Sequence, residues 1–229
     1  MNPFQELNTT LIACRLCPRL VAWREQVARE KRRAYRDWDY WGKPVPGFGD
    51  LAARVLVVGL APGAHGSNRT GRMFTGDASG DFLYAALHRA GFANLPVSKY
   101  RDDNLVLRDI FISAVARCAP PDNRPTPAEI NTCLPYLRQE MVLLTQVQVI
   151  VALGRIAFDT ILRLYANRSQ RTDLEMRKFH FAHGASYHLG SHNPHLIASY
   201  HPSRQNTQTG RLTPAMFDSV WTTTLALLH

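Results

Sequence analysis

The chain carries four short runs of apolar residues, each bounded by glycine, proline or polar residues. They cover residues 54–60, 109–116, 148–153 and 195–200, and Val55-Leu-Val-Val58 is typical of them. Such runs, without apolar/polar alternation, are typical of strands buried on both faces of a parallel sheet. We therefore predict four parallel strands at these positions.

Segments with helical spacing alternate with these runs. Thr126 and Glu129 form a capping box with a proline between them, which is a helix-start signal. Helices are predicted over residues 1–23, 78–90, 126–144, 154–166 and 213–228, whereas the polar stretch 167–192 is expected to be a surface excursion. Strand–helix alternation without hairpin signals predicts a single domain over residues 1–229. Its expected fold is α/β, a three-layer α/β/α sandwich around a four-stranded parallel sheet.

Two polar segments follow predicted strands directly: Gly59–Asp77 after the first and His201–Asn206 after the last. Ligands of open α/β sheets bind beyond the carboxyl ends of the strands, so Phe74, Asp77 and His201 are expected to converge there. The first segment matches neither a Walker A motif nor a G-x-G-x-x-G fingerprint. Its N–H groups could face an anion, or the segment could be a plain tight turn. Asp77 equally suits a helix N-cap, and Phe74 and His201 suit ordinary core positions.

The net charge of +9 favours a polyanionic partner. Arginine, which dominates the 27 basic residues, forks onto phosphate and stacks on bases, although genome composition explains the bias as well. The basic run 24–36 is interpreted as a solvated helix face. The N-terminus has no signal-peptide pattern, and no apolar run reaches the roughly 18 residues of a membrane span. A cytoplasmic protein without membrane contact is expected.

The four cysteines form a C-x2-C pair, Cys14 and Cys17, and a distant pair, Cys118 and Cys133. In a cytosolic chain this pattern argues against structural disulfides. Four thiolates suit tetrahedral zinc or an iron–sulfur cluster, and the spacing leaves both open, with merely buried cysteines as a third interpretation.

Three segments carry a family resemblance: GLAPGAHGSNRTGRMFTGD, ARCAPPDNRPTPAEINTCLPYL and SYHPSRQNTQTGRLT. They resemble the iron–sulfur uracil-DNA glycosylases, specifically family 5, and the likeness covers most of the chain. The resemblance implies a [4Fe–4S] cluster on Cys14, Cys17, Cys118 and Cys133 that ties the N-terminus to the domain. It also implies a monomeric, monofunctional enzyme that excises deaminated bases from DNA and associates with the nucleoid. No lysine lies in the three segments, so no lyase activity is expected.

The same resemblance assigns roles in the base pocket. Phe74 would stack on the flipped uracil, and His201 would hydrogen-bond its carbonyl as negative charge gathers on the leaving base. The N–H groups near Gly63 and Ala64 would add to that stabilisation. Asn123 matches a family asparagine near the site.

The segment after His201 is expected to contact DNA. Ser203, Arg204, Gln205 and Asn206 would enter the minor groove and occupy the gap left by the flipped nucleotide.

Two positions depart from related groups. Ala64 stands where the sister family 4 has an acidic residue, so Asp77 becomes the candidate for water activation by elimination. Ala114 stands where other glycosylases carry asparagine, which predicts a pocket less selective for uracil, and the resemblance implies a broader range that includes hypoxanthine. Two alternatives remain: a catalytically silent damaged-DNA binding protein, and a zinc-stabilised nucleotide-binding protein.

Overall fold

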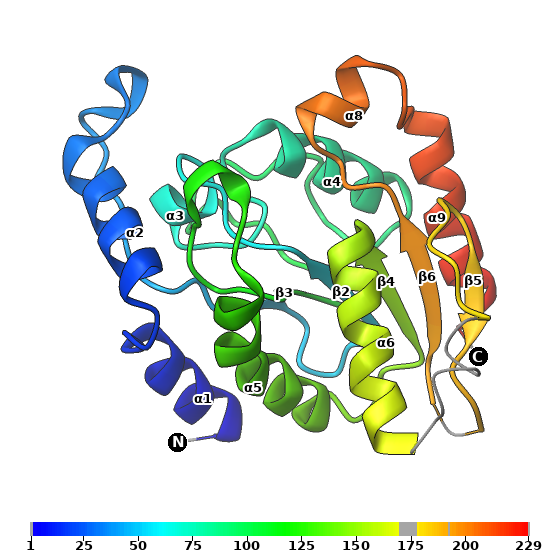
Figure 1. Cartoon of the computed structure of the whole chain (residues 1–229). Coiled ribbons are helices and arrows are strands. Elements are labelled where there is room, and N and C mark those ends of the chain that lie inside the picture. The colour runs from blue at the N-terminus through cyan, green and yellow to red at the C-terminus, as the bar shows by residue number, and fades with distance from the viewer. Residues whose placement is uncertain (1, 170–177, 192, 229) are drawn as a thin grey trace.

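The computed structural model describes residues 2–169, 178–191 and 193–228, and it has a six-stranded sheet at its centre (Figure 1). The strand order is β1-β3-β2-β4-β6-β5. The strands are β1 (Phe48–Gly49), β2 (Val55–Gly59), β3 (Ile110–Ala114), β4 (Val149–Leu153), β5 (Ser186–His188) and β6 (His195–Ser199). The four central strands are parallel and lie within the four predicted runs, so that prediction is confirmed.

The prediction of only four strands was wrong, because an antiparallel strand is added at each edge. β1 pairs with β3, and β5 pairs with β6. β1 has two residues and β5 three, which is too short for an apolar pattern, and β5 is largely exposed. β5 lies within the predicted surface excursion 167–192, of which residues 170–177 and 192 fall outside the described residues.

Helices cover both faces of the sheet (Figure 1). Leu83, Leu87, Phe217 and Trp221 pack from α4 and α9 onto one face. Phe4, Leu137, Phe158 and Ile161 pack from α1, α5 and α6 onto the other. The longer helices are α1 (Pro3–Ile12), α2 (Pro18–Glu30), α4 (Ala78–Arg89), α5 (Pro127–Leu143), α6 (Arg155–Ser169) and α9 (Pro214–Ala226). The short ones are α3 (Ser67–Thr70), α8 (Arg204–Gln208) and the 3-10 turns η1 (Arg33–Tyr35) and η2 (Pro121–Asn123).

The N-terminal segment is two helices rather than the single helix predicted over 1–23. α1 ends at Ile12 and α2 begins at Pro18, so the C-x2-C pair lies in the connection between them. Proline is favoured at the first position of a helix and disfavoured inside one, which explains the break. The interpretation of 24–36 as a solvated face was wrong for Arg24, which is 2% exposed.

Among the described residues, no helix combines the length and apolarity that crossing a bilayer requires.

A buried ion pair fixes the segment before α4. The Arg72 guanidinium bonds Asp103 at 2.7 Å and also donates to Ser98 and Thr75. Asp103 accepts three further hydrogen bonds, from the backbone N–H groups of Lys99, Tyr100 and Leu105. The loop that carries Phe74 is therefore held to the 98–105 segment by charged hydrogen bonds out of water.

Because Asp103 also accepts hydrogen bonds from three backbone N–H groups, removing Asp103 and removing Arg72 should destabilise the protein to different extents. Asp103→Ala leaves a buried guanidinium without its carboxylate and is expected to lower the free energy of unfolding by about 3–5 kcal/mol. Arg72→Met should cost less, because Asp103 keeps its backbone donors. Urea unfolding of both variants and of the double variant measures the difference. Equal losses in the two single variants would contradict this account.

Candidate active site

The sheet topology brings the two polar segments to one edge. β2 and β6 flank β4, and all three strands are parallel, so the chain leaves β2 and β6 at the same edge of the sheet. Beyond this edge, the rings of Phe74 and His201 lie 5.8 Å apart between centroids, inclined by 31°. The expected convergence of these two residues is therefore confirmed.

Phe74 is held in an unusual backbone conformation. Its φ is 51°, a left-handed value that a bulky residue rarely adopts. A Cβ on Gly59 would lie 2.8 Å from the Phe74 ring, and one on Gly80 would lie 1.7 Å from its carbonyl oxygen. Strained conformations persist where the surroundings fix them, and they concentrate at ligand sites. Two glycines thus make room for a ring presented at the sheet edge.

Asp77 is the N-cap of α4, which confirms the structural interpretation of this residue. Its Oδ1 accepts hydrogen bonds of 3.0 Å from the N–H groups of Ser79 and Gly80. Its Oδ2 lies over the first loop, 3.0 Å from where a Gly63 Cβ would stand and 2.0 Å from one on Gly66. Burial raises the pKa of this carboxyl, against the lowering effect of the two N–H donors. One oxygen caps the helix and the other faces the Gly63 loop.

His201 is a neutral histidine in this environment. Burial lowers its pKa from 6.5 to about 4. The Asn206 amide donates a 2.8 Å hydrogen bond to the His201 carbonyl and so holds its backbone. A neutral imidazole keeps one N–H to donate, which suits a developing negative charge.

The remaining residues predicted for the base pocket are Gly63, Ala64, Ala114 and Asn123, and they differ in burial and in hydrogen bonding. Within the described part of the chain, the N–H groups of Gly63 and Ala64 make no hydrogen bond, so both are free to donate. Ala114 is buried at the end of β3, opposite Gly59. Asn123 is exposed in η2 with a left-handed φ of 56°, and no hydrogen bond joins it to Phe74 or His201.

The predicted DNA-contact segment forms a short helix. Ser203 is the N-cap of α8, and Arg204, Gln205 and Asn206 form its first turn. Arg204 and Gln205 are exposed, whereas the Asn206 side chain is occupied by His201. Burial raises the pKa of Asp81 in the first turn of α4, and the nearby charge of Arg204 partly offsets this effect.

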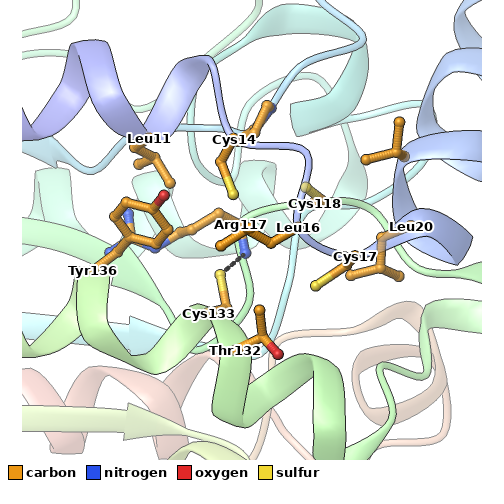
Figure 2. A pocket seen from close by; sticks show the side chains of 12 residues that line it. Leu11, Cys14, Leu16, Cys17, Leu20, Arg117, Cys118, Thr132, Cys133 and Tyr136 are labelled. Atoms are coloured by element: carbon orange, nitrogen blue, oxygen red, sulfur yellow. Dashed lines mark hydrogen bonds between the residues drawn. The ribbon is translucent and has the colours of Figure 1, made fainter.

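The four cysteines line one pocket, and neither Phe74 nor His201 is among its lining residues. Figure 2 shows this pocket. The enclosed cavity has a volume of about 20 Å³, and Leu11, Leu16 and Leu20 supply apolar walls. Figure 2 shows Cys14 and Cys17 reaching in from the α1–α2 connection, opposite Cys133 on α5. The pairs that are distant in sequence are thus brought together.

Positive and polar groups surround these sulfurs. Arg24 donates a 2.8 Å hydrogen bond to Cys118 Sγ, and the Arg117 N–H donates to Cys133 Sγ at 3.3 Å. Burial raises the pKa of the Cys118 thiol to about 11 and that of Cys133 to about 12. Arg24 was not recognised from the sequence as a partner of the cysteines, because its position in a basic run gives no sign of burial.

The arrangement differs from a single-ion site. Among the described residues, no three His, Cys, Asp or Glu side chains are grouped so that they could hold one metal ion.

Comparison with known proteins identifies the family. The model of the uracil DNA glycosylase superfamily matches residues 46–224. A type-5 uracil-DNA glycosylase of Mycobacterium leprae is 54% identical over 94% of this chain and 92% of its own length. The chain belongs to this superfamily, and within it to the type-5 group. A type-5 enzyme of Thermus thermophilus is 56% identical over 91% of this chain and 90% of its own. One of Pyrobaculum aerophilum is 43% identical over 92% and 87%.

The lowered pKa of His201 predicts a pH-dependent contribution to stability. The folded chain keeps His201 neutral down to about pH 4, whereas the unfolded chain takes up this proton near pH 6.5. The contribution is therefore complete above pH 6.5 and is lost as the pH falls toward 4, by on the order of 2–3 kcal/mol. Urea unfolding of wild type and His201→Asn at several pH values measures it. A difference between the two proteins that stays constant with pH would contradict the assignment.

Proposed function

We propose that this protein is a monofunctional uracil-DNA glycosylase. The observation that carries the proposal is the Phe74–His201 pair at the carboxyl edge of the sheet, in a chain that matches type-5 enzymes over more than nine-tenths of its length. In the reaction the bond between C1′ and the base nitrogen breaks, and water adds to C1′. The products are free uracil and an abasic site. No lysine lies in the loops that form the site, so strand cleavage by an amine is not part of the proposal.

The leaving base is the first group that the site must stabilise. A flipped uracil would stack on Phe74, whose strained backbone presents the ring. Neutral His201 and the free N–H groups of Gly63 and Ala64 would donate to the base as negative charge gathers on it. None of these donors has to give up a proton, so the charge is stabilised by dipoles already in place.

The sugar and the attacking water are the second part of the reaction. Asp77 Oδ1 accepts the hydrogen bonds of the helix cap. Its other oxygen, Oδ2, would orient water or stabilise the oxocarbenium ion. Ala64 offers no carboxylate at the neighbouring position. Buried Ala114 presents only a methyl group, which supports a broader base range that includes hypoxanthine.

DNA would be held by cations around this edge. Arg204 and Gln205, which are exposed at the start of α8, would enter the minor groove beside the flipped nucleotide, and Ser203 precedes them. Asn206 would act through His201 rather than on DNA. Both double- and single-stranded DNA are proposed as substrates.

The cysteine pocket supports a [4Fe–4S] cluster rather than zinc. Four thiols gathered around one pocket, with N–H donors from Arg24 and Arg117 at two of the sulfurs, fit the ligation of such a cluster. Cys14, Cys17, Cys118 and Cys133 would hold it. Its place, remote from Phe74, supports a structural role that ties the α1–α2 connection to α5.

Uracil excision and its dependence on Asp77 test the proposal. An end-labelled duplex with one uracil, incubated with protein and then treated with alkali, should break at that position, and a thymine duplex should not. Asp77→Asn should slow single-turnover excision by on the order of 10²–10⁴, the range of a positioned general base. DNA binding should survive, because asparagine caps a helix about as well as aspartate.

The outcomes separate the alternatives. Binding to the uracil duplex without cleavage by wild type would favour the silent damaged-DNA binding protein. Excision by Asp77→Asn at the wild-type rate would reduce Asp77 to a cap. A hypoxanthine duplex in the same assay tests the broader range.

The cluster is tested by iron content and thiol protection. Purified protein should be yellow-brown, with about four irons per chain, and its four cysteines should resist alkylation until iron is removed. Cys17→Ser should reduce the yield of soluble protein more than the excision rate of what remains. Colourless, fully active protein with one zinc would overturn the assignment.

A further inference from the structure

Arg69 makes an unusual set of contacts behind the loop that carries Asp77. It lies on α3 and is 3% exposed. Its Nε donates to the carbonyl of His65 at 2.7 Å, and its Nη2 donates to that of Gly76 at 2.8 Å. His65 follows Ala64 directly and Gly76 precedes Asp77 directly, so one guanidinium spans the two sides of the loop.

Two aromatic rings close over the same guanidinium. The Arg69 Cζ lies 4.0 Å from the ring centroids of both Tyr35 and Trp38, which meet each other edge to face. The backbone adds to this contact, because the Trp41 N–H donates to the Arg69 carbonyl at 2.9 Å. The segment after α2 is thus fastened to the first loop at this point.

The Arg69 guanidinium is buried without a salt bridge. No carboxylate among the described residues lies within ion-pair distance of it, and its buried Nη1 has no hydrogen-bond partner. A buried charge that is held mainly by carbonyls and ring faces is costly to keep. Gly76 leaves the room for it, since a Cβ there would lie 2.4 Å from Nη2.

We infer that Arg69, held under Tyr35 and Trp38, is a positioning residue that sets the separation of Ala64 and Asp77 across the base site. The inference rests on the proposed glycosylase function. A planar fork with two fixed donors spans two carbonyls, which a lysine ammonium does not reproduce. Displacement of catalytic groups by about 1 Å lowers rates by as much as 10²-fold.

The positive charge of Arg69 also affects the pKa of Asp77. Burial raises the pKa of Asp77 and Asp81 raises it further, while Arg69 and the N–H groups of Gly80 and Ser79 lower it. Loss of the Arg69 charge should therefore raise the pKa of Asp77. If the ionised carboxylate is the active form, the acid limb of the excision profile should move to higher pH.

The test uses single-turnover excision and DNA binding on full-length variants. Arg69→Gln should slow excision by on the order of 10- to 100-fold, change DNA affinity little and move the acid limb upward. Arg69→Lys should restore the acid limb but not the rate. Trp38→Leu, at a half-buried position, should slow excision with the acid limb unchanged, and it carries the test even if Arg69→Gln fails to fold. Arg33→Gln, on the same segment and exposed, is the control for lost charge alone.

Two results would overturn the inference while leaving the enzyme intact. One is excision by folded Arg69→Gln and Trp38→Leu within about twofold of wild type. The other is a loss confined to DNA affinity and equal to that of Arg33→Gln. Wild-type protein that releases no uracil would instead overturn the proposed function.

Discussion

The placement of β4 between β2 and β6 is the constraint on which the site depends. Because these three strands are parallel and in register, the segments after Gly59 and Ser199 must leave the sheet at one edge. The glycine-rich segment after β2 then brings the Phe74 ring next to His201, which follows β6 on the other side of β4. The strand order thus sets the approximate positions of these two segments. The α4 cap and the Arg69 contacts then fix the conformation of the first segment.

A second set of contacts joins the cysteine pocket to this loop. Arg24 donates to Cys118 Sγ and to the Cys14 carbonyl, and its own carbonyl accepts a 3.2 Å hydrogen bond from the Asn68 amide. The same amide lies 3.4 Å from the Ala64 carbonyl. These hydrogen bonds therefore connect the cysteine pocket to the loop that faces Asp77. A change in the packing of the cysteines would be passed to this loop through Arg24 and Asn68.

Sequence reasoning succeeded where a local pattern determines the outcome. The four apolar runs are the parallel strands, and Asp77 caps the helix that it precedes. It failed where long-range packing decides. Arg24 looks like its basic neighbours until α2 is packed against Cys118, and the edge strands are recognised only through pairing with β3 and β6. Arg69 was missed for the same reason, since Tyr35 and Trp38 reach it from a different segment.

The backbone at Phe74 also limits how such a loop could change over evolutionary time. A side chain at Gly80 would overlap the Phe74 carbonyl, and one at Gly59 would overlap its ring. Neither glycine can therefore be replaced by another residue while the Phe74 ring keeps its present position. The three positions are therefore constrained together. A side chain at Gly59 is tolerated only after the Phe74 ring has moved, and one at Gly80 only after the Phe74 backbone has moved.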